Sequence, residues 1–124
     1  MVFCMKQLLL VLSLFSFMVL SADTTVVDQE IEFLITSVEQ SGCSFHRNGD
    51  NHSAERAADH LRLKLRRGKK YADSAEHFID RLASKSSWTG KAYYLECEPG
   101  KLIEVSPWMN EKLASYRQQQ ANQK

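Results

Sequence analysis

The chain has 124 residues with 16 basic and 15 acidic side chains, which gives a formal net charge of +1 at pH 7. A chain of this length can bury one hydrophobic core, so we expect one small domain. The nearly balanced charge argues against nucleic acid as a partner, because binding to a phosphate backbone needs a net basic surface.

The first 22 residues have the pattern of a secretory signal peptide. Lys6 makes the start positive, residues 8–20 are apolar apart from two serines, and the small residues Ser21 and Ala22 follow. The apolar run is shorter than the ~20 residues that span a bilayer as a helix, which disfavours an uncleaved anchor. We therefore expect a periplasmic or secreted product, residues 23–124, with no stable membrane anchor after cleavage. It is neutral, since only Lys6 is lost.

Cleavage also removes Cys4 and leaves two cysteines, Cys43 and Cys97. An even number of cysteines in a small exported domain favours a disulfide between them. Two separate buried thiols are the alternative.

A first helix is predicted from Thr25, a good N-cap residue, to about Ser41, with Gly42 as its stop. Apolar side chains recur along it at helical spacing and form one stripe: Val27, Ile31, Leu34, Ile35 and Val38. A polar loop follows, in which residues 44–46 can form a short strand before an Asn48-Gly49 turn.

A second helix is predicted from the N-cap Ser53 to about Arg67, with Gly68 just past its end. Its core stripe consists of Ala54, Ala57, Ala58, Leu61 and Leu65. A third helix begins with the capping box 73–76, in which Asp73 takes the cap position, and runs to about Ala83. A second polar loop occupies residues 84–91.

Two strands, 92–97 and 102–105, flank a turn at 98–101. Ser106-Pro107 opens a fourth helix, which ends near Arg117. The tail 118–124 is polar and has no apolar face to bury, so we expect disorder there. The predicted fold is a helix-rich α+β single domain over residues 23–117, with about four helices and a small antiparallel β-hairpin sheet.

The stretch Phe45–Ser53 is dense in polar side chains and admits three interpretations. His46, Asp50 and His52 are of types that bind zinc, but their spacing matches no metal motif, so we expect no metal and no cofactor. Arg47 and the start of the second helix could hold an anion. The favoured interpretation is a structural turn, with Asn48-Gly49 reversing the chain and Ser53 capping the helix.

The second polar loop offers hydroxyl groups at Ser86, Ser87 and Thr89, followed by Gly90-Lys91. It lacks the spacing of a nucleotide-binding loop, and no nucleophile-elbow glycines surround the serines. A small cell-envelope hydrolase with a loop histidine as base is therefore the weaker alternative. We expect Trp88 to fill core space beneath the loop rather than to form a ligand platform.

The second helix and its connector carry a basic run over residues 62–70. Such a face is ordinarily solvated, and its charges complement the helix C-terminus. Binding of an anionic lipid, glycan or cell-wall polymer is the functional alternative. We expect His60, at the flank of the core stripe, to be a partly buried packing residue rather than a catalytic base.

Several separated motifs resemble the YfeK-like family of small exported bacterial proteins. They are Arg47-Asn48-Gly49-Asp50 with His52, the run 60–65, Ala75-Glu76 with Phe78-Ile79, and Ala83-Ser84 through Thr89-Gly90-Lys91 to Tyr93. The resemblance spans about residues 45–95. It implies a soluble bacterial protein of the periplasm and supplies no activity, cofactor or catalytic residue.

Both polar loops take part in this resemblance, so we expect the segments 45–53 and 84–93 to converge on one recognition surface. The candidate binding residues are Arg47, Asn48, Asp50, His52, Ser87, Thr89 and Tyr93. We predict an exported, non-enzymatic binding or interaction domain, whose partner is an envelope protein or an anionic ligand.

Overall fold

The computed structural model describes residues 25–124, so the predicted signal peptide and Cys4 lie outside the described residues. The elements in chain order are α1 (Val26–Glu39), β1 (Ser44–Arg47), β2 (Asp50–His52), α2 (Ala54–Gly68), η1 (Lys69–Tyr71), α3 (Ala75–Phe78), η2 (Ile79–Ala83), β3 (Tyr94–Glu98), β4 (Lys101–Glu104) and α4 (Val105–Asn122). The short helix α3 continues directly into η2, a turn of π-helix.

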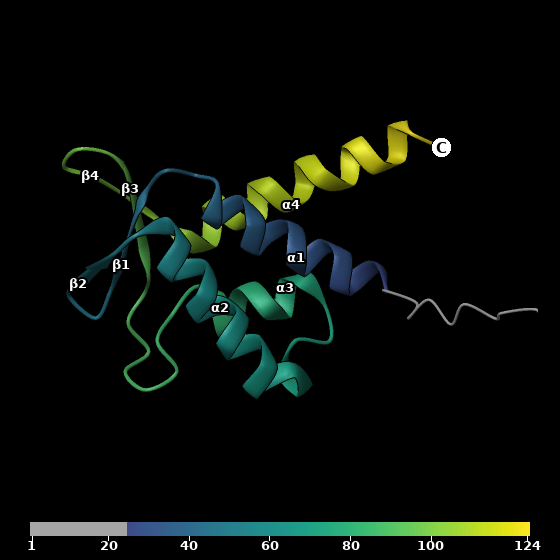
Figure 1. Ribbon diagram of the computed structural model, residues 1–124. Coiled ribbons are helices and arrows are strands. Elements are labelled where there is room, and N and C mark those ends of the chain that lie inside the picture. The colour runs from purple at the N-terminus through teal and green to yellow at the C-terminus, as the bar shows by residue number, and fades with distance from the viewer. Residues whose placement is uncertain (1–24) are drawn as a thin grey trace, which may run out of the picture.

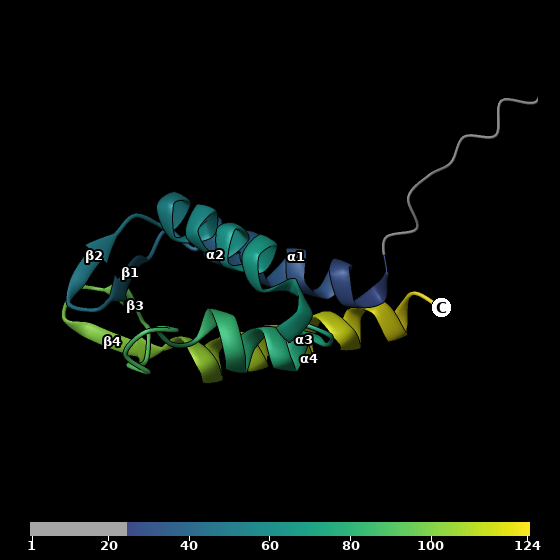
Figure 2. The ribbon, with the colours of Figure 1, turned by 90° about the horizontal axis from the view of Figure 1, so that it is seen from below.

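The helices form two layers. Figure 2 shows α1 and α2 in one layer and α3 and α4 in the other, with the sheet at one end of both. In Figure 1 the C-terminus and the start of α1 lie at the opposite end of the molecule from the sheet. The predicted class, a helix-rich α+β single domain, is confirmed.

The sheet has four antiparallel strands in the order β2-β1-β3-β4. It thus consists of two hairpins joined where β1 pairs with β3, through Ser44 opposite Glu96 and Phe45 opposite Leu95. The strand β2 was not predicted, because its residues are mostly exposed and show no apolar alternation. The Asn48-Gly49 turn was predicted, and both residues have positive φ, 51° and 83°.

The first two helices begin as predicted. The side chain of Thr25 accepts a hydrogen bond from the backbone N–H of Asp28, and Ser53 accepts one from Arg56. At α3 the predicted cap was wrong: Ser74, not Asp73, accepts the helix N–H, from His77. Asp73 instead pairs with the imidazole of His77.

Gly68 also differs from its predicted role. It is the last residue of α2, buried, with a φ of −117°, rather than a left-handed stop beyond the helix. A Cβ at this position would come within 3.0 Å of Leu82. Glycine therefore allows α2 and η2 to approach each other closely.

The core lies between the two helical layers and the inner face of the sheet. The predicted stripe of α1 is buried at Ile31, Leu34, Ile35 and Val38. It packs with the alanines and Leu61 of α2, with Phe78 and Ile79, and with the α4 side chains Met109 and Leu113. Burial of these apolar surfaces is the main favourable term in folding.

The helix α4 continues to Asn122, through residues that we expected to be disordered. Its exposed extension contributes no buried side chain. Alanine and glutamine have good helix propensity, and adding residues to an existing helix costs little. The extension therefore follows from local propensity rather than from packing.

The predicted disulfide is confirmed: Cys43 is bonded to Cys97. The two cysteines flank the paired residues Ser44 and Glu96, so the bond links β1 to β3 just beyond their pairing. This covalent link is compatible with a location outside the cytoplasm. Within residues 25–124 no helix combines the length and apolar character that crossing a membrane requires.

Candidate functional site

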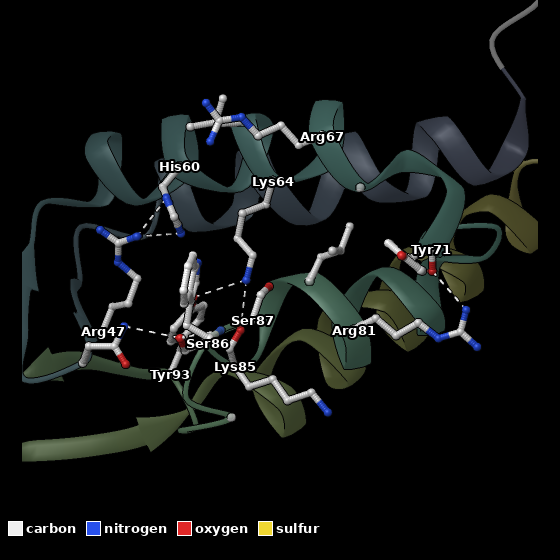
Figure 3. A pocket seen from close by; sticks show the side chains of 16 residues that line it. Arg47, His60, Lys64, Arg67, Tyr71, Arg81, Lys85, Ser86, Ser87 and Tyr93 are labelled. Carbon is white, nitrogen blue, oxygen red and sulfur yellow. Dashed lines mark hydrogen bonds between the residues drawn. The ribbon is translucent and has the colours of Figure 1, made fainter.

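A cavity of about 730 Å³ lies beside α2, between this helix, η2 and the loop 84–93. Figure 3 shows side chains from all three around it, with Arg47, His60 and Lys64 near Tyr93 at one end and Tyr71 and Arg81 at the other. Leu63, Gly68 and Leu82 also line it. We call this cavity the α2 pocket.

The α2 pocket is cationic. Five of its lining residues carry a positive charge: Arg47, Lys64, Arg67, Arg81 and Lys85. The lining contains no aspartate and no glutamate. Among the described residues only Arg81 of these five pairs with a carboxylate, that of Asp73 at 3.9 Å. The other four charges are therefore not neutralised by an acidic neighbour.

Helical periodicity places these groups on one side of α2. Lys64 follows His60 by about one helical turn, and Arg67 follows Lys64 by about one more. The same spacing makes Leu63 a neighbour of both His60 and Arg67 on the helix surface. The alanine stripe of the same helix, with Ala58 and Leu61, faces the core instead. The helix thus separates an apolar packing face from a cationic pocket face.

Arg47 and His60 contact each other at the end of the pocket that contains Tyr93. The guanidinium Nη1 of Arg47 lies 2.9 Å from Nδ1 and 2.7 Å from Nε2 of the imidazole. Because a guanidinium can only donate, the imidazole accepts through an unprotonated nitrogen. Burial, together with the positive charges of Arg47 and Lys64, lowers the pKa of His60 to about 4. His60 is therefore neutral at pH 7.

Lys64 is the second cation at this end. Its ammonium donates to the backbone oxygen of Lys85 at 3.0 Å and to the hydroxyl of Tyr93 at 3.2 Å. Burial, and then the nearby charge of Arg47, lower the pKa of Lys64 to about 8. Burial likewise raises the pKa of Tyr93, whose side chain is only 2% exposed. A negative group in the pocket would relieve the repulsion that Lys64 experiences.

The two polar loops meet through Asn48. Its side-chain oxygen accepts a hydrogen bond from the hydroxyl of Thr89 at 3.0 Å, and its amide nitrogen donates to Ser86 at 3.4 Å. The same Ser86 oxygen accepts the backbone N–H groups of Trp88 and Thr89, each at 3.3 Å. The expected convergence of the segments 45–53 and 84–93 is therefore present.

Four of the seven candidate binding residues line the α2 pocket: Arg47, Asn48, Ser87 and Tyr93. Thr89 fixes the loop through Asn48. Asp50 and His52 lie in β2, outside the pocket lining; Asp50 is exposed, and the buried Nε2 of His52 has no hydrogen-bond partner. A binding role for the seven residues stays a prediction.

Sequence reasoning missed most of the pocket's positive charge. It named Arg47, it favoured a solvated face over anion binding for Lys64 and Arg67, and it gave no role to Arg81 or Lys85. The recurrence of His60, Lys64 and Arg67 along one flank of the alanine stripe was the available signal. Only the fold shows that η2 and the loop 84–93 enclose that side.

Trp88 corrects a further expectation. We expected it to fill core space under the loop, whereas its side chain is 98% exposed. Ser86 and Tyr93 of the same segment are both buried, so they take the inward positions and Trp88 lies outside. Hydrogen bonds fix the backbone at this position, including one from the Trp88 N–H to the Ser86 hydroxyl.

Metal and hydrolase chemistry find no support in this geometry. Within residues 25–124 no three histidine, cysteine, aspartate or glutamate side chains gather in a way that could hold a metal ion. In the same region no serine or threonine hydroxyl is hydrogen-bonded to a histidine side chain: the Ser74 hydroxyl accepts only the backbone N–H of His77, and the imidazole of His60 is engaged by Arg47. A nucleophile and its base are therefore not brought together.

The fold and the α2 pocket define a small, disulfide-linked α+β domain with a cationic cavity. Residues 25–117 match a family described as "Family of unknown function (DUF5329)", and the chain belongs to this family.

The chain is also 51% identical over 55 residues to the uncharacterized protein YfeK of Salmonella typhimurium strain LT2. That match covers 44% of this chain and 46% of the relative, about half of each. It supports the resemblance drawn from the loop and helix motifs. No solved structure matches the chain.

Proposed function

We propose that this protein is an exported binding domain that holds an anionic ligand in the α2 pocket. The observation that carries the proposal is the charge of the cavity, lined by five cations and no carboxylate. Two of these cations, Arg47 and Lys64, are half-buried, and their hydrogen-bond partners among residues 25–124 are neutral. Positive charges that lack an internal counterion are free to bind an external one.

The compartment is part of the proposal. The pattern of residues 1–22 predicts export, and the Cys43–Cys97 disulfide favours an oxidising environment such as the periplasm. The ligand is then a carboxylate, phosphate or sulfate group of the cell envelope or of its surroundings. The pocket also offers neutral donors for such a group, among them Asn48 and Ser87.

The experiment is an NMR titration of the ¹⁵N-labelled mature protein with inorganic phosphate. We expect chemical-shift changes at the backbone amides that surround the pocket, such as those of Asn48 and Gly90. Lys64→Gln should weaken binding by roughly 10-fold or more, the usual cost of losing a charge-assisted hydrogen bond. The matched control is Arg66→Gln, which removes an exposed cation of α2 outside the pocket lining.

A pH series sharpens this test. Because the pKa of Lys64 is about 8, its positive charge is lost as the pH rises through that value, and phosphate binding should weaken there. Lys64→Arg should keep its charge and remove this decline. Equal phosphate affinities of Lys64→Gln and Arg66→Gln, or shift changes confined to residues outside the pocket, would refute the proposed function.

A further inference from the structure

The loop 84–93 carries the exposed side chain of Trp88 on a hydrogen-bonded backbone. The backbone N–H of Ser86 donates to the Lys91 oxygen at 2.9 Å, and that of Gly90 donates to the Ser86 oxygen at 3.0 Å. The hydroxyl of Ser86 holds Trp88 and Thr89 from within, and Asn48 ties the loop to the β1–β2 turn. The backbone that carries the nearly fully exposed indole is therefore ordered before any partner arrives.

The surroundings of Trp88 are basic and polar. The loop carries Lys85 and Lys91 and contains no acidic residue. Trp88 itself borders the α2 pocket, so the charges of Arg47 and Lys64 lie in the cavity next to it. Figure 1 shows this loop projecting from the molecule between η2 and β3.

We infer that the Trp88 loop docks the protein onto an anionic bilayer surface, and that the phosphate of a lipid headgroup is the anion that enters the α2 pocket. This inference rests on the proposed function, because it names the source of the anion. Tryptophan favours the membrane–water interface, where its ring is buried and its N–H stays hydrated. Lysines near the surface add attraction to anionic lipids.

The chemistry of the loop favours a bilayer over a protein partner. The buried core of a stable protein interface is ordinarily formed by several neighbouring apolar side chains, whereas Trp88 is surrounded along the loop by Ser87, Thr89 and Gly90. One indole among hydroxyl groups and lysines matches the mixed headgroup layer instead. Docking of this kind is peripheral and needs no membrane-spanning helix.

The experiment uses vesicles of phosphatidylglycerol and, for comparison, of phosphatidylcholine. The starting protein is the mature chain carrying Trp108→Phe, so that Trp88 is the sole tryptophan. We expect co-sedimentation and a blue shift of the Trp88 emission with phosphatidylglycerol, both reduced by salt, and neither with phosphatidylcholine. Trp88→Ala should lower the vesicle affinity at least tenfold in the sedimentation assay.

The matched control is Leu102→Ala, which removes another exposed apolar side chain, 52% exposed on β4, and should leave vesicle binding unchanged. Equal vesicle affinities of Trp88→Ala and Leu102→Ala would overturn the inference, as would the absence of vesicle binding. Binding to heparin that depends on Trp88, without binding to vesicles, would also overturn it and point to a glycan. Phosphate binding that is sensitive to Lys64→Gln would in either case leave the proposed function standing.

Discussion

At the scale of single residues, the pocket is unusual because most of its positive charges have no carboxylate partner. Cations on a protein surface commonly lie near carboxylates, as Arg62 does here with Glu32 and Glu39, each at 3.0 Å. Arg47 instead rests on a neutral imidazole, and Lys64 on a backbone oxygen and a phenol. Holding partly buried positive charges without a carboxylate partner lowers the stability of the folded protein. Such a loss of stability is common at functional sites.

His60 gives this arrangement a measurable pH dependence. Its pKa is about 4 in the folded protein and near 6.5 in the unfolded chain, so between these values the unfolded chain binds more protons. The free energy of unfolding should therefore fall as the pH drops from 6.5 to 4. Because solvent screens a half-buried group, we expect His60 to contribute about 1–2 kcal/mol to this decline.

Urea denaturation at a series of pH values measures the effect. His60→Gln, which cannot take up the proton, should flatten the decline, whereas His77→Gln, a change at a histidine outside the pocket, should keep it. A decline equally steep in His60→Gln and in the unmodified protein would show that His60 does not cause it.

At the scale of elements, the sequence predicted the helices correctly where their positions depend on local patterns. The apolar stripes of α1 and α2 and the caps Thr25 and Ser53 depend on residues within a few positions of each other. The strand β2 depends instead on pairing with β1, and a three-residue polar segment carries no signal of that pairing. Tertiary contacts explain this failure.

In the candidate site, too, features set by neighbouring residues were predicted and features set by tertiary contacts were not. The turn at Asn48 could be read from two adjacent residues, and the meeting of the two polar loops was expected from their common resemblance to one family. The pocket itself requires α2, η2 and the loop 84–93 to be placed together, so no local pattern shows that Lys64 and Arg81 line one cavity. The exposure of Trp88 likewise depends on which residues of its segment take the inward positions.

The disulfide acts at this scale, because it joins the segment after α1 to β3. Its 54-residue separation means that the bond restricts a long loop of the unfolded chain. In the chain-entropy treatment, the double change Cys43→Ser and Cys97→Ser should lower the free energy of unfolding by roughly 4 kcal/mol.

Reversible denaturation of the double variant, compared with the oxidised protein, checks this value. The protein with reduced and alkylated cysteines provides a second comparison without mutation. An unchanged midpoint in both cases would mean that the paired strands alone restrict the chain as much as the covalent bond does.

At the scale of the whole molecule, one arginine ties three helices together. Arg117 of α4 pairs with Glu30 of α1, through contacts of 2.5 and 3.1 Å, and with Glu76 of α3. These carboxylates raise the pKa of Arg117, through hydrogen bonds first, and Arg117 in turn lowers the pKa of Glu76. The contacts join the two helical layers, which Figure 2 shows, and none of the three residues belongs to the pocket lining.

Arg117→Gln should therefore destabilise the fold without altering the pocket. Glu30 is only 5% exposed, and removing its cation leaves a buried charge unpaired. We expect a loss of about 2–3 kcal/mol at pH 7, below the range for fully buried pairs because Arg117 is partly exposed. Lys112→Gln, at an α4 cation that lies over the Trp108 ring and has no carboxylate partner in the described part of the chain, should cost under ~0.5 kcal/mol.

Adding Glu30→Gln to Arg117→Gln tests the cause, since the second change removes the stranded charge and should restore part of the stability. Urea denaturation of the four proteins, unmodified, Lys112→Gln, Arg117→Gln and the double variant, measures both effects. Equal stability of Arg117→Gln and Lys112→Gln would mean that apolar packing alone holds α4 against α1. Loss of phosphate binding in a folded Arg117→Gln protein would contradict the independence of the pocket from this cluster.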